Sequence, residues 1–451
     1  MSDRKKNSNR ILLCAYACNP GKGSEESVGW DTTVALAHRG HSITVLTRSK
    51  ESQDCVSQIP DGLSIRFVAF DLPSVLRFVF SKVGKLGVEL EYLLWSLMAR
   101  KVVLKLQEKH AFDSAQHVTY ARYWMPSPLA SLPVPFIWGP LGGGESIPAL
   151  LRGSFSQNGL RFERMRDRMR DLGERSKLVR ACARRSAVAL ANTSETADRM
   201  RHLGAHNVQI VNSAALSSRE YARLAKKAHS NNAYDFVSVG RALEWKGFQF
   251  GIRAFAALNA RDSRYAIISN GPHLKSLKAL AEQLDVMDQI DFFDFLPRDQ
   301  VFDILGASKA LVHPSMHESG GFVCLEAMAA GCPVVCLRTG GPGLFVDDSS
   351  GYPVFVGSVD ETISRLTAAM TSVREDAAAH EFKRLSGQKR VARLFSMEVK
   401  ADQLSEMHLE LSGRSNEKTR TRDRKQIPAI GRNRRRSTAR TDTPDQKSTA
   451  S

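Results

Sequence analysis

Two carboxylates and a pair of glycines lie close together in the sequence, just after an apolar run. Glu318 and Glu326 have seven residues between them, and Gly320-Gly321 stands in that interval. Residues 310–312 predict a short buried strand, and residues 322–330 are rich in helix formers. A strand, a polar loop and a helix N-terminus in this order are typical of ligand sites at the carboxyl ends of parallel strands. The spacing therefore predicts a binding site that uses both carboxylates.

A second loop could supply fixed positive charge to the same site. Residues 235–239 predict a strand, which leads into Arg241 and Lys246 on one glycine-bounded loop. Two cations held on one loop can neutralise a diphosphate. A bare basic pair is weak evidence, but next to the two carboxylates it favours a site for a phosphorylated ligand.

The segment from His313 to Cys336 resembles the Glu-x7-Glu motif of the retaining glycosyltransferases of family 4. Residues 240–247 match that family's Gly-Arg-x(4)-Lys-Gly pattern residue for residue, and the likeness covers about residues 10–411. The resemblance implies an α/β protein of the GT-B fold. In that fold two Rossmann-like domains face each other across a cleft, and a C-terminal helix crosses back to the first domain.

The resemblance also implies a role for each matched residue. Glu318 is expected to contact the donor sugar, and Glu326 the ribose of the nucleotide. Arg241 and Lys246 are expected to contact the donor phosphates and to stabilise the leaving group. His117 ends a predicted strand where the family often places a histidine near the donor sugar. The alternative for this lone histidine is a structural role.

Further donor-binding residues follow from the same resemblance. Leu296 lies in the strand and loop that frame the nucleotide base, and Gly271 lies in a turn that looks like the family's Gly-x-Gly-Pro turn. Gly23 belongs to a glycine loop after the first predicted strand, which in the family borders the donor phosphates and the acceptor. The remaining predicted donor-binding residues are Gly320, Gly321 and Phe322.

The order of predicted elements divides the chain into five segments. The length suits two α/β domains with extensions. The predicted segments are a flexible N-terminus (1–10), an acceptor-side Rossmann-like domain (11–212), a nucleotide-sugar-binding Rossmann-like domain (213–395), a crossing helix (396–412) and a disordered basic tail (413–451).

Positive charge gathers in two regions of the chain, whose formal net charge is +17. The tail is rich in Lys and Arg and poor in large apolar residues, so it could bind anionic lipid or nucleic acid, or be solvated. Residues 71–109 alternate apolar clusters with cations. Such a basic amphipathic stretch can lie on an anionic membrane or can pack on the core.

Cysteine usage and hydropathy predict a cytoplasmic protein. None of the seven cysteines has Cys-x-x-Cys spacing, and most fall in apolar segments, which favours reduced core thiols over zinc ligands. The apolar run 11–17 is interpreted as the first strand rather than as a signal peptide, and no apolar stretch is long enough to span a bilayer. Peripheral binding to the inner face of the plasma membrane is the hypothesis for the tail.

Taken together, the motifs predict a retaining, hexosyltransferase-type enzyme. It would move a sugar from a UDP- or GDP-sugar to a glycan or lipid-linked acceptor in cell-surface polysaccharide or glycolipid synthesis. The nucleotide-sugar is its substrate, and neither a cofactor nor a metal ion is expected. A sugar-nucleotide epimerase or phosphorylase of the same fold is one alternative. A non-enzymatic nucleic-acid-binding protein is the other, but it would leave the Glu, Arg and Lys residues without a role, so nucleic acid is not the expected partner.

Overall fold

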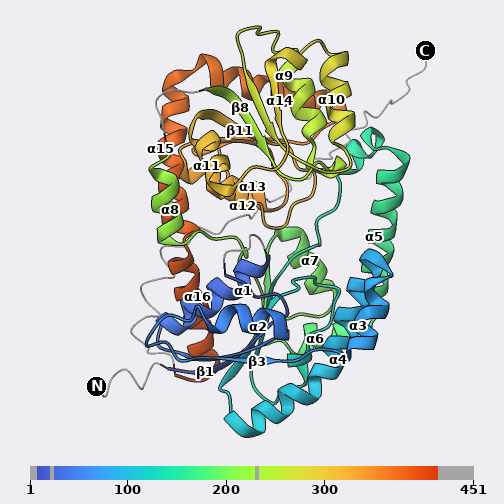
Figure 1. Ribbon diagram of the computed structural model, residues 1–451, viewed down its shortest axis with the longest axis vertical. Helices are drawn as coiled ribbons and strands as arrows, with labels where there is room; N and C mark the ends of the chain where they lie inside the picture. The colour runs from blue at the N-terminus through green and yellow to red at the C-terminus, as the bar shows by residue number, and fades with distance from the viewer. Residues whose placement is uncertain (1–7, 21–24, 229–232, 415–451) are drawn as a thin grey trace, which may run out of the picture. The chain divides into compact units, whose positions relative to one another are not determined.

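The computed structural model describes residues 8–20, 25–228 and 233–414, which two parallel β-sheets organise (Figure 1). The first sheet has seven strands in the order β3-β2-β1-β4-β5-β6-β7. These are β1 (Arg10–Ala15), β2 (Ser42–Thr47), β3 (Ile65–Ala69), β4 (Ser114–Thr119), β5 (Phe136–Leu141), β6 (Val188–Ala191) and β7 (Val208–Ile210). We call the part of the chain from β1 to β7 the first half.

The helices of the first half connect consecutive strands, as parallel pairing requires. The α-helices are α1 (Glu25–His38), α2 (Ser49–Val56), α3 (Ser74–Ser81), α4 (Gly84–His110), α5 (Gln157–Arg175), α6 (Lys177–Arg185) and α7 (Ser194–His202). Two short 3-10 helices are η2 (Pro128–Ser131) and η3 (Ala149–Ser154).

The second sheet has six strands in the order β10-β9-β8-β11-β12-β13. These are β8 (Tyr234–Val239), β9 (Tyr265–Ile268), β10 (Ile290–Phe293), β11 (Ser308–His313), β12 (Val334–Leu337) and β13 (Gly351–Val354). We call the part of the chain from β8 to β13 the second half. The remaining helices are α8 (Ser218–Ala225), η4 (Glu244–Lys246), α9 (Phe248–Ala257), α10 (Leu274–Gln283), η5 (Met287–Gln289), α11 (Arg298–Gly306), α12 (Phe322–Ala329), α13 (Gly340–Phe345), α14 (Val359–Glu375), α15 (Ala377–Leu394) and α16 (Met397–Leu411).

The central strands are apolar on both faces because helices cover both sides of each sheet. In β1 every residue after Arg10 is buried, and β12 is buried throughout. The predicted strand at 310–312 and helix at 322–330 correspond to β11 and α12, with ends that differ by one or two residues. The prediction of two Rossmann-like units is confirmed at this level.

The last helix, α16, packs on the first half, as the expected crossing helix should (Figure 1). Asn9 donates a hydrogen bond from Nδ2 to the carbonyl of His408 at 2.7 Å. The His41 ring nitrogen Nε2 lies 2.7 Å from the hydroxyl of Ser405. These buried polar contacts fix α16 to the residues just before β1 and β2.

A segment between β5 and α5 packs in the core of the second half. Ile147, Leu151 and Phe155 join a buried cluster that includes Phe236 and Phe250. The chain therefore contributes to the second core before it reaches β6 and β7 of the first sheet. The polypeptide passes between the halves more than once along its length.

Several predictions concern residues outside the described ranges or features of composition. The loop 21–24, which contains Gly23, and the basic tail from 415 are outside the described residues. All seven cysteines are buried and free. No described helix is long and apolar enough to cross a membrane. Within the described ranges, no group of three or more His, Cys, Asp or Glu side chains could hold a metal ion.

Candidate active site

The amine of Lys246 forms an ion pair with the carboxylate of Glu318. Lys246 ends η4, which follows β8, whereas Glu318 lies in the loop between β11 and α12. Both side chains are about one-fifth exposed, at 18% and 19%. The structure therefore brings together two residues to which the sequence assigns one site, although they are 72 positions apart.

Backbone contacts hold these two loops against each other. Gly247 has a φ of +72°, and a Cβ at this position would lie 2.1 Å from the carbonyl oxygen of Pro314. Only glycine allows that approach, because a side chain would clash and because this φ disfavours other residues. The N–H of Met316 donates to the carbonyl of Trp245 at 2.8 Å. The glycine after Lys246 thus positions the lysine beside the carboxylate loop.

Lys246 and His313 both lie beside the Glu318 carboxylate. Burial alone would raise the pKa of Glu318, but the charge of Lys246 and the nearby His313 hold it well below its usual range. His313 Nε2 lies 3.6 Å from Glu318 Oε2, and burial lowers the pKa of this imidazole. Glu318 is therefore ionised at neutral pH, and His313 is neutral.

The second carboxylate, Glu326, has a different partner. Arg298, the first residue of α11, donates from Nη2 to Glu326 Oε1 at 2.7 Å and also lies 2.8 Å from Glu220 Oε1. Burial raises the pKa of Glu326, and Arg298 opposes that shift. The sequence analysis did not identify Arg298, because its position directly after Pro297 carries no local signal of this contact.

The glycine pair and Phe322 lie between the two carboxylates, as the motif requires. Gly321 is the residue that precedes the first turn of α12, and Gly320 is half-buried beside it. The N–H of Gly341 donates to the carbonyl of Glu318 at 2.7 Å, which fixes the loop. Phe322 packs against buried clusters of both halves.

Arg241, Gly271 and Leu296 lie at the carboxyl ends of neighbouring strands of the second sheet. Ala242, next to Arg241, donates its N–H to the carbonyl of Asn270 at 2.6 Å and so joins the Gly271 turn to the cationic loop. Arg241 is exposed, and Leu296 is half-buried against another buried cluster, which includes Val237 and Leu311 of the second sheet. The predicted donor-binding residues that the structure describes, apart from His117, thus share one sheet edge.

His117 belongs to the first sheet and has a different environment. It lies near the carboxyl end of β4, in register with Cys14 and Trp138 of the neighbouring strands. The side chain is buried, and burial lowers its pKa to about 4. Its Nδ1 atom is buried without a hydrogen-bond partner. This imidazole is neutral at physiological pH and could contact an uncharged hydroxyl rather than a phosphate.

A buried carboxylate that the sequence analysis did not identify links the two halves. Glu145, which follows the Gly142–Gly144 run, accepts through Oε2 from Ser319 Oγ at 2.5 Å and from the N–H of Gly143 at 3.0 Å. Its other oxygen accepts from Thr193 at 2.5 Å. Since Ser319 directly follows Glu318, Glu145 positions the carboxylate loop from the first half. Its place beside a glycine-rich run was the signal that could have identified it.

Aromatic stacking makes a second contact between the halves. Trp245 lies between Phe162 of α5 and His317, with ring centroids 5.1 and 5.2 Å apart and nearly parallel planes. His317 Nε2 is 3.1 Å from Glu163 Oε1. Trp245 directly precedes Lys246, and His317 directly precedes Glu318. Through Phe162 and Glu163, α5 therefore supports both loops of the ion pair.

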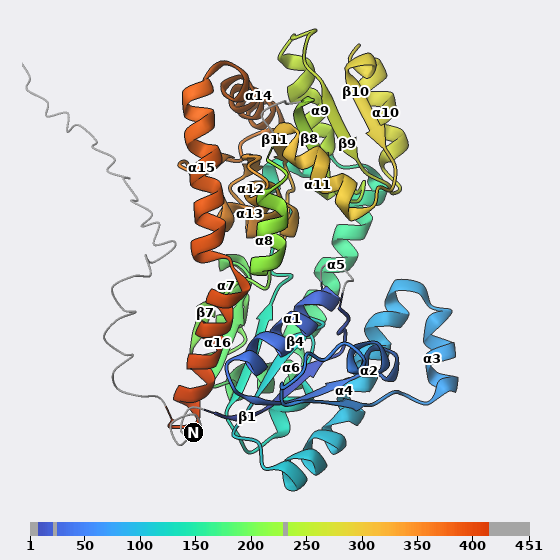
Figure 2. The ribbon, with the colours of Figure 1, turned by 60° about the vertical axis from the view of Figure 1, so that its left-hand side comes forward.

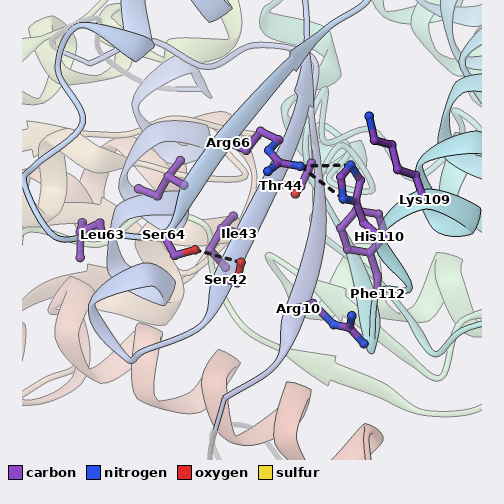
Figure 3. A pocket seen from close by; sticks show the side chains of 11 residues that line it. Arg10, Ser42, Ile43, Thr44, Leu63, Ser64, Arg66, Lys109, His110 and Phe112 are labelled. Carbon is purple, nitrogen blue, oxygen red and sulfur yellow. Dashed lines mark hydrogen bonds between the residues drawn. The ribbon is translucent and has the colours of Figure 1, made fainter. Parts of the chain in front are cut away.

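A separate cavity of about 380 Å³ lies at the opposite ends of the strands (Figure 3). It is lined by residues from the amino ends of β1 to β3 and from the C-terminus of α4, among them Arg10, Arg66 and His110. In parallel sheets ligands bind at the carboxyl ends of the strands, where Lys246 and Glu318 lie. The cavity is therefore not the candidate active site.

Known proteins resemble this chain in the sequence of residues 222–386 and in fold. Residues 222–386 match the family model described as Glycosyl transferases group 1. A 2-deoxystreptamine N-acetyl-D-glucosaminyltransferase of Streptomyces fradiae is 28% identical over 231 residues, which are 49% of this chain and 50% of that protein. The match with this relative thus spans only half of its length.

The solved structures that are similar to this chain are distant in sequence. Sucrose-phosphate synthase of Thermosynechococcus elongatus has a TM-score of 0.63 at 16% identity, and the match covers 90% of this chain and 100% of that one. Alr3699/HepE of Anabaena, solved in complex with UDP, has a TM-score of 0.57 at 16% identity, over 88% and 99% of the two chains. The architecture is the expected GT-B fold. Residues 222–386 are therefore similar to group 1 glycosyltransferases, and the solved structures show the fold.

Proposed function

We propose that the protein transfers a sugar from a nucleotide-sugar donor to a glycan or lipid-linked acceptor, with retention of the anomeric configuration. The observation that carries this proposal is the Lys246–Glu318 ion pair, at the sheet edge that also presents Arg241 and Glu326. These residues offer cations for a diphosphate and carboxylates for sugar hydroxyls. The UDP bound to the structural neighbour from Anabaena is a ligand of this chemical class.

In the proposed reaction, negative charge grows on the diphosphate as the bond to the sugar breaks. Lys246 and Arg241 stabilise that charge, and preorganised electrostatic stabilisation is usually the largest catalytic contribution. Glu318 is ionised, so it accepts hydrogen bonds from the sugar hydroxyls and orients the ring. Glu326 accepts from the ribose hydroxyls, which compete with Arg298 for its oxygens. His117, neutral and in the first half, contacts an uncharged sugar hydroxyl.

This assignment separates the two carboxylates from the acid and base of a glycosidase. In a glycosidase both carboxyl groups flank the bond that is cleaved. Here each carboxylate has its own cation, Lys246 for Glu318 and Arg298 for Glu326, and each binds a different part of the donor. The products are a nucleoside diphosphate and the glycosylated acceptor.

The proposed mechanism requires no divalent metal ion, because Arg241 and Lys246 supply the positive charge. We therefore expect turnover to continue after treatment with EDTA. A complete loss of activity that Mg²⁺ restores would contradict this part of the proposal.

A nucleotide-release assay tests the proposed function. UDP- and GDP-sugars are incubated with the protein and with soluble or lipid-linked acceptors, and free UDP or GDP is measured. We expect release that depends on both one donor and one acceptor, and loss of release in Lys246→Ala. Turnover of the sugar nucleotide without acceptor would instead identify an epimerase, and turnover that needs free phosphate would identify a phosphorylase.

A further inference from the structure

The outer surface of α3 and α4 exposes large apolar side chains. None of the eight residues of α3 is buried, and the exposed fractions of Val75, Phe78 and Val79 are 70%, 65% and 51%. The inner face of α3 is different, because Phe80 packs against the core of the first half. In Figure 2 α3 lies at the margin of the first half, beside the start of α4. Isolated exposed apolar residues are ordinary, but a contiguous group of them marks an interaction surface.

The exposed face of α4 continues this apolar surface. Leu86, Leu90, Leu97 and Leu104 are all at least one-third exposed. They recur at intervals of four, seven and seven residues, which places them along one side of an α-helix. The opposite side of α4 carries the buried aromatic residues Tyr92 and Trp95. The leucine stripe therefore belongs to the solvent side and not to the core.

Cations predominate among the exposed charged residues of this surface. The exposed cations described on α3, α4 and the turn between them are Arg77, Lys82, Arg100, Lys101, Lys105 and Lys109, and among the described residues of these helices Glu108 is the one exposed acid. The other two acidic residues of α4 do not face solvent in the same way, because Glu89 is buried in an ion pair with Arg122 and Glu91 is half-buried beside Tyr16. Lys82 Nζ lies 5.0 Å from the centre of the Phe78 ring, so cationic and apolar groups are interleaved.

We propose that this surface, the outer face of α3 and α4, docks on an anionic lipid bilayer. Its apolar side chains would insert at the level of the lipid headgroups, and its Lys and Arg side chains would pair with the lipid phosphates. Apolar groups flanked by cations are what an amphipathic helix needs to lie in the interface of such a bilayer. The inference goes beyond sugar transfer and does not depend on it.

The inner side of α4 contacts the part of the first half that carries His117. Glu89, on the inner side of α4, accepts a hydrogen bond from the hydroxyl of Tyr120 at 3.2 Å. Tyr120 follows β4, the strand that carries His117. A bilayer bound to the outer face of α4 would therefore lie on the side of this helix opposite Tyr120.

Site-specific labelling of the full chain tests the proposal. Phe78→Cys is labelled with an environment-sensitive fluorophore, and the seven native cysteines, all buried, should not react. The matched control is Phe382→Cys on α15, because Phe382 is also an exposed phenylalanine, at 61%. We expect the emission at position 78 to shift to shorter wavelength with phosphatidylglycerol-containing vesicles, and the emission at 382 to stay unchanged. Vesicles of phosphatidylcholine alone should give no shift.

Two results of this experiment would overturn the proposal. If the protein co-sediments with anionic vesicles while the label at 78 remains in water, another part of the chain, such as the basic tail, makes the contact. If the shift at 78 occurs without vesicles and grows with protein concentration, the surface binds a second copy of the chain.

Charge variants of the full chain provide an independent test. The triple variant Arg77→Gln, Lys82→Gln, Arg100→Gln should lose vesicle affinity by about fivefold for each cation removed. The matched control removes Arg253, Lys275 and Lys389, which are exposed cations of α9, α10 and α15, and should bind vesicles like the native chain. Equal losses in the two variants would show that only net charge matters and would contradict docking through α3 and α4.

Discussion

The carboxyl ends of the two sheets differ in how they handle charge. In the second sheet Glu318 is paired with Lys246 and Glu326 with Arg298, so fixed charges remain in a partly buried environment. In the first sheet the predicted site residue is His117, which burial keeps neutral. Charged groups in such a place are costly unless they are paired. In the proposed function, the second half exchanges its internal ion pairs for those of an anionic ligand, whereas His117 in the first half offers an uncharged contact.

We call the carboxyl edge of the second sheet, with Lys246 and Glu318, the charged edge. The largest effect is expected when this edge loses Lys246. Lys246→Ala should lower turnover by about 10²–10³-fold, because a preorganised cation at the leaving group is removed. It also leaves Glu318 ionised and unpaired, which should lower the free energy of unfolding by about 3–5 kcal/mol. Steady-state kinetics and denaturant unfolding measure the two effects.

A double variant separates these two consequences. Lys246→Met with Glu318→Gln leaves no unpaired charge, so most of the stability should return while activity stays low. Normal turnover in Lys246→Ala, with only the KM for the donor raised, would show that the lysine binds substrate and transition state equally.

Arg241 should affect catalysis without affecting stability. It is exposed, so Arg241→Ala removes no buried partner. We expect turnover to fall by about tenfold or more, and by more than the donor KM rises, since the leaving-group charge develops in the transition state. Lys275→Ala on α10 is the matched control, because it removes an exposed cation of the second half that lies outside the proposed site. A change in Arg241→Ala no larger than in this control would remove Arg241 from the mechanism.

A smaller effect is expected at the second carboxylate. Glu326→Ala should weaken binding of the nucleotide by about tenfold, because hydrogen bonds to a charged group contribute about 1.5–3 kcal/mol each. The loss should be partial, since Arg298 already binds one oxygen of Glu326 and competes with the ribose hydroxyls for it. Calorimetric titration with an intact fold measures it. Unchanged affinity would exclude the ribose assignment.

Sequence motifs predicted the charged edge better than its surroundings. Lys246 and Glu318 lie in loops with a local signature, so their meeting follows from the order of strands in a parallel sheet. Arg298 and Glu145 reach the same region from other elements, and such long-range contacts leave no pattern in the neighbouring residues. The amphipathic pattern of residues 71–109 was equally compatible with core packing and with a lipid surface. Only the exposed fractions of residues such as Phe78 distinguish these two interpretations.

The smallest effect is on the pH dependence of stability, which should differ between the two sheets. The pKa of His117 is lowered from 6.5 to about 4, so the unfolded state takes up the proton first as pH falls. Native stability should therefore decrease between pH 6.5 and about 4, by at most about 1.4 kcal/mol per pH unit from this group. His117→Gln should flatten that slope in urea unfolding at several pH values. An identical slope in the variant would contradict a buried neutral imidazole.

The charged edge should respond to acid in a different range. The pKa of Glu318 is depressed, so its contribution to stability is present above the ordinary glutamate value of 4.5 and is lost as pH falls further. Glu318→Gln should therefore alter the pH dependence of stability below pH 4.5, where His117→Gln has little further effect. Similar profiles for both variants would remove the proposed difference between the two sheets.

Nucleotide binding to three forms of the protein most directly tests the proposal that the second sheet, and not His117 of the first, binds the nucleotide. UDP and GDP are titrated by calorimetry, near neutral pH, into the native chain, Glu326→Ala and His117→Gln. We predict that one of the two nucleotides binds the native chain, that Glu326→Ala weakens this binding by about tenfold, and that His117→Gln leaves it unchanged. If neither nucleotide binds the native chain, or if His117→Gln weakens binding as much as Glu326→Ala does, the account of a charged donor edge and a neutral His117 is wrong.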